Sequence, residues 1–193
     1  ESIFSPYIRC ELAVVDEVGL LFNFPISGEE AIEITYKNIS DDTIKTLYFV
    51  VDNITDLTAA DDARSMGYII KCVSLESYAN NKQTIQQAYH DTVPNIVKTI
   101  FDQHIDQKIR EVFTGYTPPT LVVENNDVEA YTIVIPNLHP FAAFAMLGEM
   151  AGETVNRFTY LLYQTTDSYN FRTLQGLIID NRASKNKALK NKY

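Results

Sequence analysis

Apolar and polar residues alternate with a period of two in several segments of the first 75 residues. The clearest segment is 31–36, where Ile32 and Ile34 alternate with Glu33 and Thr35, as expected of a strand with one face in water. Similar short runs lie before and after it at near-regular spacing, with turn residues between them, at 8–14, 21–26, 45–54 and 68–75. This pattern predicts a small β-barrel or β-sandwich.

The pattern changes to helical spacing after residue 75. Asp91 or Thr92 is a candidate cap for a helix with Pro94 in its first turn and an apolar face. A second short helix is expected around 105–113. The polar segment 77–89 is expected to be loosely helical, and a strongly apolar helix is expected to start at Pro140 and stop near Gly152. Strands are expected at 121–123, 131–135, 158–163 and 171–179.

These elements predict an α+β chain. We expect a β domain over 1–75, a mixed α/β domain over 76–182 and a basic, flexible tail over 183–193. The tail reads first as a solvated end and second as an arm that docks on an anionic partner.

The charge of the chain narrows the choice of partners. It has 25 Asp and Glu against 16 Lys and Arg, a net charge of −9. Gripping nucleic-acid phosphates needs clustered basic residues, so specific DNA binding is not expected. No apolar run approaches the ~20 residues of a membrane span, so membrane insertion is not expected either.

The sequence offers no catalytic constellation. Its histidines, His90, His104 and His139, lack metal-ligand spacing, and the seven glycines form no phosphate-binding motif. Adjacent carboxylates point to opposite faces of a strand and do not converge. Cys10 and Cys72 lack a CxxC spacing and are interpreted as buried free thiols. We therefore expect no catalytic residue, no cofactor and no metal, and a protein that is not an enzyme.

The order of these signals resembles a known family. The segments that carry the resemblance run from the first strand to the last hairpin, and they are 7–12, 21–30, 32–36, 47–54, 68–76, 96–100, 135–141 and 163–171. Together they resemble the baseplate central hub proteins of contractile-tailed, T-even-type phages and the hub proteins of related contractile injection machines. These are packing and turn signatures, and they cover most of 7–179.

The resemblance implies a fold and a role. It implies a tail-tube-like β domain followed by a mixed α/β domain, in a subunit of a homo-oligomer, a trimeric ring, in the phage tail baseplate of the virion, assembled in the host cytoplasm. The ring joins the central spike protein to the tail tube protein, contacts baseplate wedge proteins, and lets DNA pass during ejection without specific binding. The second tube-like domain of that family is not visible here, which leaves a fragment or a shortened hub.

The acidic character suggests which residues face such a passage. A negative lumen would keep DNA from sticking. The lumen-facing candidates are Glu11, Glu29, Glu30, Glu33, Asp41 and Asp42. Two other classes stay open: a carbohydrate-binding or adhesion module of a tail or secreted system, with Tyr68, Tyr78, Tyr116 and Tyr169 as loose candidates for an aromatic platform, and an enzyme whose site has no recognised motif.

Overall fold

The computed structural model describes residues 2–37, 42–59, 65–124, 129–155 and 160–180. These residues form both helices and strands, so the chain mixes α and β structure as expected. The chain divides into two compact units, Tyr7–Tyr78 and a second unit of Glu1–Pro6 with Ala79–Tyr193. The domain boundaries 1–75 and 76–182 stay a prediction, and the basic tail 183–193 lies outside the described residues.

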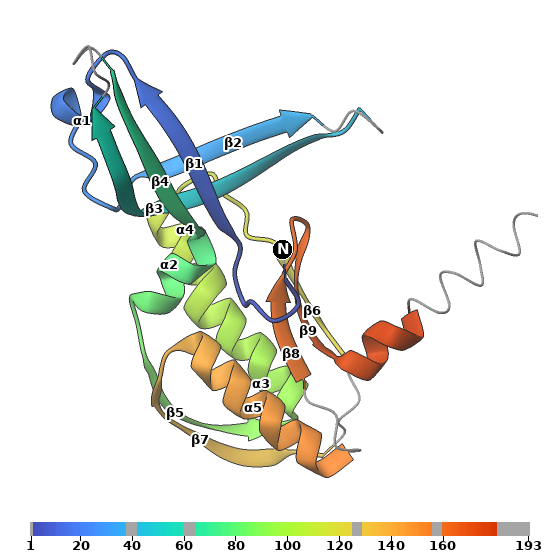
Figure 1. Ribbon diagram of the computed structural model, residues 1–193. Coiled ribbons are helices and arrows are strands. Elements are labelled where there is room, and N and C mark those ends of the chain that lie inside the picture. Colours follow the sequence, from blue (N-terminus) through green and yellow to red (C-terminus); the bar gives the residue numbers. More distant parts are fainter. Residues whose placement is uncertain (1, 38–41, 60–64, 125–128, 156–159, 181–193) are drawn as a thin grey trace, which may run out of the picture. The chain divides into compact units, whose positions relative to one another are not determined.

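The unit Tyr7–Tyr78 contains one curled antiparallel sheet (Figure 1). Its strands lie in the order β1 (Arg9–Asp16), β4 (Met66–Ser74), β3 (Ile44–Ala59) and β2 (Ala31–Lys37). The register between β3 and β4 shifts twice, at Val51/Asn53 and at Thr55/Thr58. Such bulges bend a strand and increase its twist, which accounts for the curl. Within the described residues the sheet is an open half-barrel, so the expected barrel or sandwich is not complete there.

One face of this sheet carries an apolar cluster. Five buried side chains form its centre, and they are Phe49, Val51, Tyr68, Ile70 and Cys72. The segment 21–26 was expected to be extended, and this is wrong for its first half, because Leu20–Asn23 is a short helix, α1. Leu21 and Ile26 pack against the cluster, so the segment covers part of the apolar face.

The second unit holds a two-stranded ribbon of β5 (Ile85–Asp91) and β7 (Tyr131–Leu138). The prediction of a loose helix over 77–89 is therefore right only for its first part. Residues 77–81 belong to the helix α2 (Leu75–Asn81), whereas residues 85–89 belong to the strand β5. Ile85 and Tyr89 are buried in β5, and the pairing with β7 supplies the hydrogen bonds that a strand of such polar composition needs.

A long helix runs from Val93 to Val112. Of the two candidate caps, the structure has Thr92, and Pro94 lies in the first turn as predicted. The parts of the helix are α3 (Val93–Ile100), the π-helix η1 (Phe101–Asp106) and α4 (Gln107–Val112). The residues at the joins, Phe101 and Gln107, have helical backbone angles. The separate second helix that was expected is therefore a continuation of the first.

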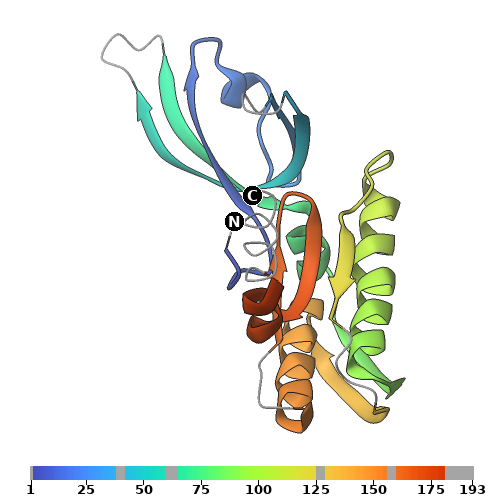
Figure 2. The same cartoon turned by 90° about the vertical axis from the view of Figure 1, so that its right-hand side faces the viewer.

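A three-stranded sheet completes the second unit (Figure 2). Its order is β6 (Thr120–Val123), β9 (Ser168–Thr173) and β8 (Tyr160–Gln164), with β6 parallel to β9. The ring of Tyr169 lies 5.2 Å from that of Phe101, which packs the long helix on this sheet.

The apolar helix α5 (Pro140–Val155) packs on the same face of the sheet and runs past the expected stop at Gly152. A Cβ at Gly148 would lie 3.1 Å from the carbonyl oxygen of Tyr160, so this glycine lets α5 approach β8 closely. The strand expected over 171–179 ends at Thr173, and residues 174–180 are helical instead.

Candidate functional site

The candidate lumen residues Glu11 and Glu33 lie on one face of the half-barrel. In β1, Cys10 and Leu12 pack against the apolar cluster, so Glu11 between them points to the other face. In β2, Ile32 and Ile34 do the same, so Glu33 also points to that other face. The two carboxylates are exposed on strands at opposite edges of the sheet.

This face carries charges of both signs. Glu11 lies directly opposite Lys71 in the ladder between β1 and β4, and Arg9 occupies the same face two residues before Glu11. Glu33 lies opposite Tyr48, and the nearby carboxylate contributes to the raised pKa of that tyrosine, after burial. The structure thus brings two candidate acids to one face and intersperses them with cations. Their exposure to a lumen stays a prediction.

The other candidates are tied to turns. The Glu30 carboxylate accepts hydrogen bonds from the backbone N–H groups of Ser27, Gly28 and Glu29 at 2.7–3.1 Å and from the Ser27 hydroxyl at 2.8 Å. These bonds, chiefly the one from the Ser27 backbone, lower the pKa of Glu30 to about 2. Glu30 therefore holds its own loop together.

Asp42 and Glu29 belong to loops at the ends of β2. Asp42 has a positive φ of 58° and forms an ion pair of 2.8 Å with Lys37, across the connection between β2 and β3. Glu29 is exposed at the start of β2. Asp41 lies outside the described residues.

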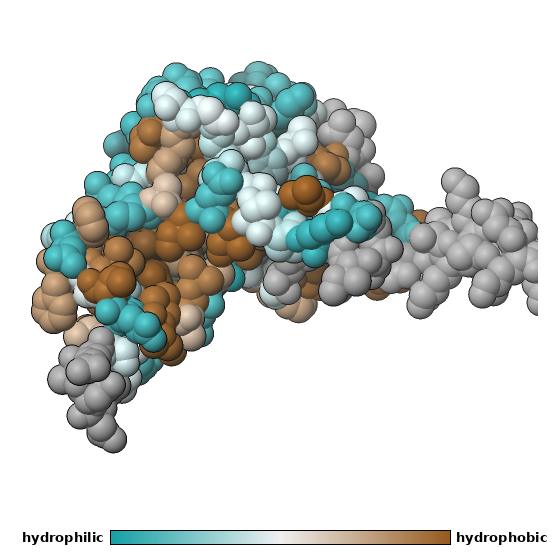
Figure 3. Space-filling view, turned by 90° about the horizontal axis from the view of Figure 1, so that it is seen from above, coloured by the Kyte–Doolittle hydropathy of each residue, from teal (hydrophilic) through white to brown (hydrophobic). Residues whose placement is uncertain are grey.

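A surface that the sequence interpretation missed lies between β1 and β2. We call it the apolar loop, and its exposed members are Val18, Leu20, Phe22 and Phe24. Phe22 and Phe24 are 80% and 70% exposed. Figure 3 shows hydrophobic side chains gathered on the side of the molecule that is seen from above. The signal in the sequence is the run Leu-Phe-Asn-Phe at 21–24, which is assigned from its pattern to an extended segment.

The apolar face beneath this loop is only partly covered. Around the five buried residues of the cluster, eleven further hydrophobic side chains pack but stay partly buried. They include members of all four strands, such as Leu12, Ile34, Leu47 and Met66. Exposed aromatic rings beside a half-covered core are typical of a surface that another protein contacts.

The outer edges of β1 and β2 have no strand partner in the described part of the chain. Along each edge, every second residue of β1 and β2 turns its backbone N–H and C=O away from the sheet. Open edges of this kind are places where a further strand can add to a sheet.

The three histidines serve local structure. His139 Nδ1 contacts the backbone carbonyls of Asn80 and Gln83 at 3.1 and 2.7 Å, and His90 Nδ1 lies 2.8 Å from the Thr132 hydroxyl. Across the described ranges, no three His, Cys, Asp or Glu side chains come together in a way that would hold a metal ion. No helix in the same ranges is both long and apolar enough to cross a bilayer.

Comparison with known proteins gives likenesses in structure only. No protein-family model and no curated protein matches the chain. The structure of the tail protein from Neisseria meningitidis MC58 superposes with a TM-score of 0.53 over 89% of this chain, at 11% sequence identity. The match covers 43% of that protein, so the chain spans less than half of its length.

At this identity the likeness shows the fold alone. The chain has a fold similar to that of a tail protein, and the similarity includes most of its 193 residues. The finer resemblance to contractile-tail hub proteins rests on the sequence signals.

Proposed function

We propose that the chain is a structural, non-catalytic subunit of a phage-type tail, in the baseplate hub. In this role it joins the central spike to the tail tube and frames the passage for DNA during ejection. The observation that carries the proposal is the fold similarity to a tail protein over 89% of the chain. The order of strand, turn and helix signals in the sequence points the same way.

The surface of the half-barrel supports an assembled state. The apolar loop exposes two phenylalanine rings, and β1 and β2 present open edges in the described residues. Burying the apolar loop against a neighbouring copy would stabilise the assembly by about 25 cal/mol for each Å² of apolar surface removed from water. The open edges could pair with strands of a neighbour through backbone hydrogen bonds. We propose a trimer, in which one surface of each subunit meets a different surface of the next and the ring closes.

The charge of the chain supports transit of DNA without binding. With 25 acidic and 16 basic residues, the subunit has too few cations to neutralise many phosphates. We propose the spike, tube and baseplate wedge proteins as its partners, and the tail baseplate of the virion as its location.

The alternative of a carbohydrate-binding module loses two of its four candidate residues. Two of the four tyrosines that suggested an aromatic platform, Tyr68 and Tyr169, are 2% and 0% exposed. A platform needs rings that a sugar can reach, so these two tyrosines cannot form one.

The test is the state of assembly of the purified chain. Its mass in solution is measured over a range of concentrations, and the same samples are imaged by electron microscopy. We expect closed rings whose mass is three times 21.9 kDa. A particle that stays monomeric, alone and with added spike and tube proteins, contradicts the proposal.

A further inference from the structure

The only two cysteines of the chain are cross-strand neighbours. They are far apart in the sequence, but the antiparallel ladder between β1 and β4 places Cys10 directly opposite Cys72. Both side chains point to the same face of the sheet, where they join the apolar cluster. Both are free thiols, Cys10 partly exposed and Cys72 2% exposed.

The geometry of the ladder suits a covalent link. Ser74 N donates a hydrogen bond of 3.0 Å to Ile8 O, so Ile8 and Ser74 form a hydrogen-bonded pair, and Cys10 and Cys72, two residues along, form the next pair of this kind. Cα atoms in such pairs lie about 5.5 Å apart, within the range of about 4.4–6.8 Å found in disulfides. The Cβ atoms start somewhat wider apart than a disulfide needs, so the strands must draw together slightly.

We propose that Cys10 and Cys72 form a reversible dithiol–disulfide site that staples β1 to β4. The bond would close a loop that contains residues 11–71, and with it α1, β2 and β3. Because the link requires a small inward movement, a reductant opens it readily. The site thus records whether the protein is in a reducing or an oxidising environment.

The chemistry needs a small-molecule disulfide such as oxidised glutathione as the oxidant. The partly exposed Cys10 thiolate attacks one of its sulfurs, forms a mixed disulfide and releases one glutathione thiolate. The Cys72 thiolate then attacks the Cys10 sulfur, forms the Cys10–Cys72 bond and releases the second glutathione thiolate. Two protein thiols are oxidised, one glutathione disulfide is reduced to two thiols, and the two protons pass to the released thiolates.

The environment of the two thiols makes the reaction slow at neutral pH. Burial, followed by the nearby Glu11 carboxylate, raises the pKa of Cys10. Burial raises the pKa of Cys72 to about 11, with smaller contributions from Cys10 and Asp52. Since only the thiolate attacks, we expect the rate of oxidation to rise about tenfold for each pH unit between about 7 and 9.

The consequence for a tail particle rests on the proposed function. A subunit assembled in the reducing cytoplasm would keep both thiols, and the staple would form after the particle reaches oxidising surroundings. The half-barrel would then be locked while its partners are already in place. The disulfide chemistry itself requires only the single chain.

The test uses the full chain in glutathione buffers of increasing oxidising strength. Trypsin cuts after Arg9 and Lys71, so Cys10 and Cys72 fall in the separate peptides 10–37 and 72–82, which mass spectrometry can detect as one linked species. We expect this species to form in excess oxidised glutathione and to disappear with dithiothreitol. The linked chain should unfold at a temperature at least about 5 °C higher.

Single variants separate the role of Cys10, which attacks the glutathione disulfide, from that of Cys72, which closes the protein disulfide. Cys72→Ser should accumulate a glutathione adduct on Cys10, whereas Cys10→Ser should leave the buried Cys72 unmodified under the same conditions. If the folded chain gives no linked peptide, or links only between chains or only in denaturant, the proposal is overturned. A chain that forms the link but no rings would contradict the proposed function and leave the dithiol site intact.

Discussion

The hydroxyl of Thr173 is held by the carboxylate of Glu124, which lies 49 residues earlier in the chain. Thr173 Oγ1 lies 3.0 Å from both oxygens of Glu124, and Thr173 N donates to the same carboxylate at 2.7 Å. The same hydroxyl accepts a hydrogen bond of 3.0 Å from Gly176 N at the start of the helix 174–180. Thr173 is thus the N-cap of this helix, and Glu124 orients its hydroxyl.

Gly176 is required by this arrangement, which gives the first prediction. A Cβ at position 176 would lie 2.5 Å from a Glu124 carboxylate oxygen, so the carboxylate would have to move and lose its bonds to Thr173. We expect Gly176→Ala to lower the free energy of unfolding by about 1–2 kcal/mol, although alanine favours helices. Urea denaturation measures the change.

The matched control is Gly176→Ala in a chain that lacks the Glu124 carboxylate. In a Glu124→Ala background, Gly176→Ala should be neutral or should stabilise the chain by up to about 1 kcal/mol, because only helix propensity remains. Equal losses in both backgrounds would show that the carboxylate is not the reason for the glycine.

The Glu30 loop predicts a dependence of stability on acid. The pKa of Glu30 is lowered to about 2, chiefly by the Ser27 backbone N–H, from an ordinary value of 4.5. A lowered pKa in the folded state means that its contribution to stability is complete above pH 4.5 and is lost as the pH falls toward 2. Between pH 4.5 and pH 2, the unfolding temperature of Glu30→Gln should therefore decrease less than that of the natural chain. Glu29→Gln removes the neighbouring charge and keeps the loop, and it should retain the full decrease.

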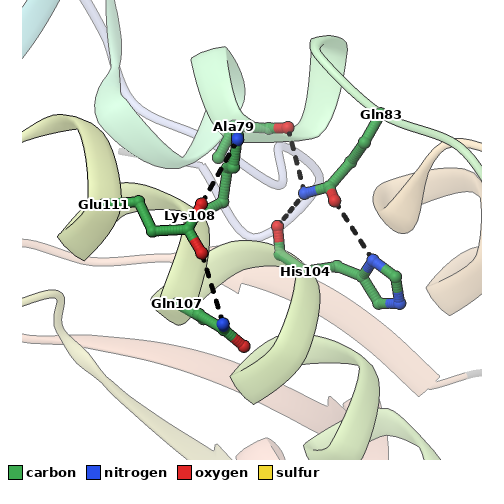
Figure 4. A network of polar contacts seen from close by, with 6 residues as sticks. All are labelled: Ala79, Gln83, His104, Gln107, Lys108 and Glu111. Atoms are coloured by element: carbon green, nitrogen blue, oxygen red, sulfur yellow. Dashed lines mark hydrogen bonds and ion pairs between the residues drawn. The ribbon is translucent and has the colours of Figure 1, made fainter.

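His104 predicts a second dependence, near neutral pH. Its Nδ1 lies 3.1 Å from Gln83 Oε1, and the Gln83 side chain also donates to the His104 carbonyl (Figure 4). Burial lowers the pKa of His104 from 6.5, so the folded state resists protonation and stability falls as the pH drops below about 6.5. We expect His104→Asn to weaken this fall, measured by urea denaturation at pH 7 and pH 5.

The comparison variant for this test is His90→Asn, which removes an exposed histidine from β5. It should keep the difference between pH 7 and pH 5. A fall in stability that persists unchanged in His104→Asn would assign it to other groups.

The sequence predicted the elements that carry their own periodicity. β2 was found because Ile32 and Ile34 alternate with polar residues, and the long helix was found because Val93, Ile96 and Ile100 share one face. α1 has only four residues, too few for any period to show, and its apolar run was assigned to an extended segment. The helix 174–180 was missed because its N-cap, Thr173, is also the last residue of β9, and its hydroxyl is oriented by Glu124, a residue distant in the sequence that follows β6.

The candidate site was predictable only in part, because strand register is a property of the fold. Alternation placed Glu33 on the face of the strand that is opposite to that of Ile32 and Ile34, and the structure has this arrangement. The pairing of Glu11 with Lys71, like that of Cys10 with Cys72, depends on how two distant strands align. The loop bonds of Glu30 depend on the turn geometry of Ser27 and Gly28, which alternation does not report.

The apolar loop predicts where assembly will fail. Phe22 and Phe24 are 80% and 70% exposed, so replacing both with serine should change the free energy of unfolding by less than about 0.5 kcal/mol each. Buried aromatic anchors in interfaces contribute about 2 kcal/mol or more, so the same double variant should weaken ring formation at least about thirtyfold. Sedimentation at several concentrations measures this loss.

Val134→Ser is the control for the apolar loop, because Val134 is 63% exposed on β7, in the other unit. It should leave ring formation unchanged. If both variants assemble as the natural chain does, the apolar loop is not the contact surface.

The placement of Glu11 and Glu33 predicts how assembled rings treat DNA. Replacing both with lysine changes the net charge of each subunit from −9 to −5, on the face where we expect DNA to pass. Rings of this variant should bind DNA, with an affinity that falls steeply as salt is added. The logarithm of the binding constant should fall linearly with the logarithm of the salt concentration, with a slope of about 0.9 for each phosphate contacted. Asp102→Lys with Glu149→Lys gives the same net charge from exposed helix positions, and its rings should bind DNA much more weakly. The lumen assignment requires this difference between the two variants, since charge alone predicts equal binding.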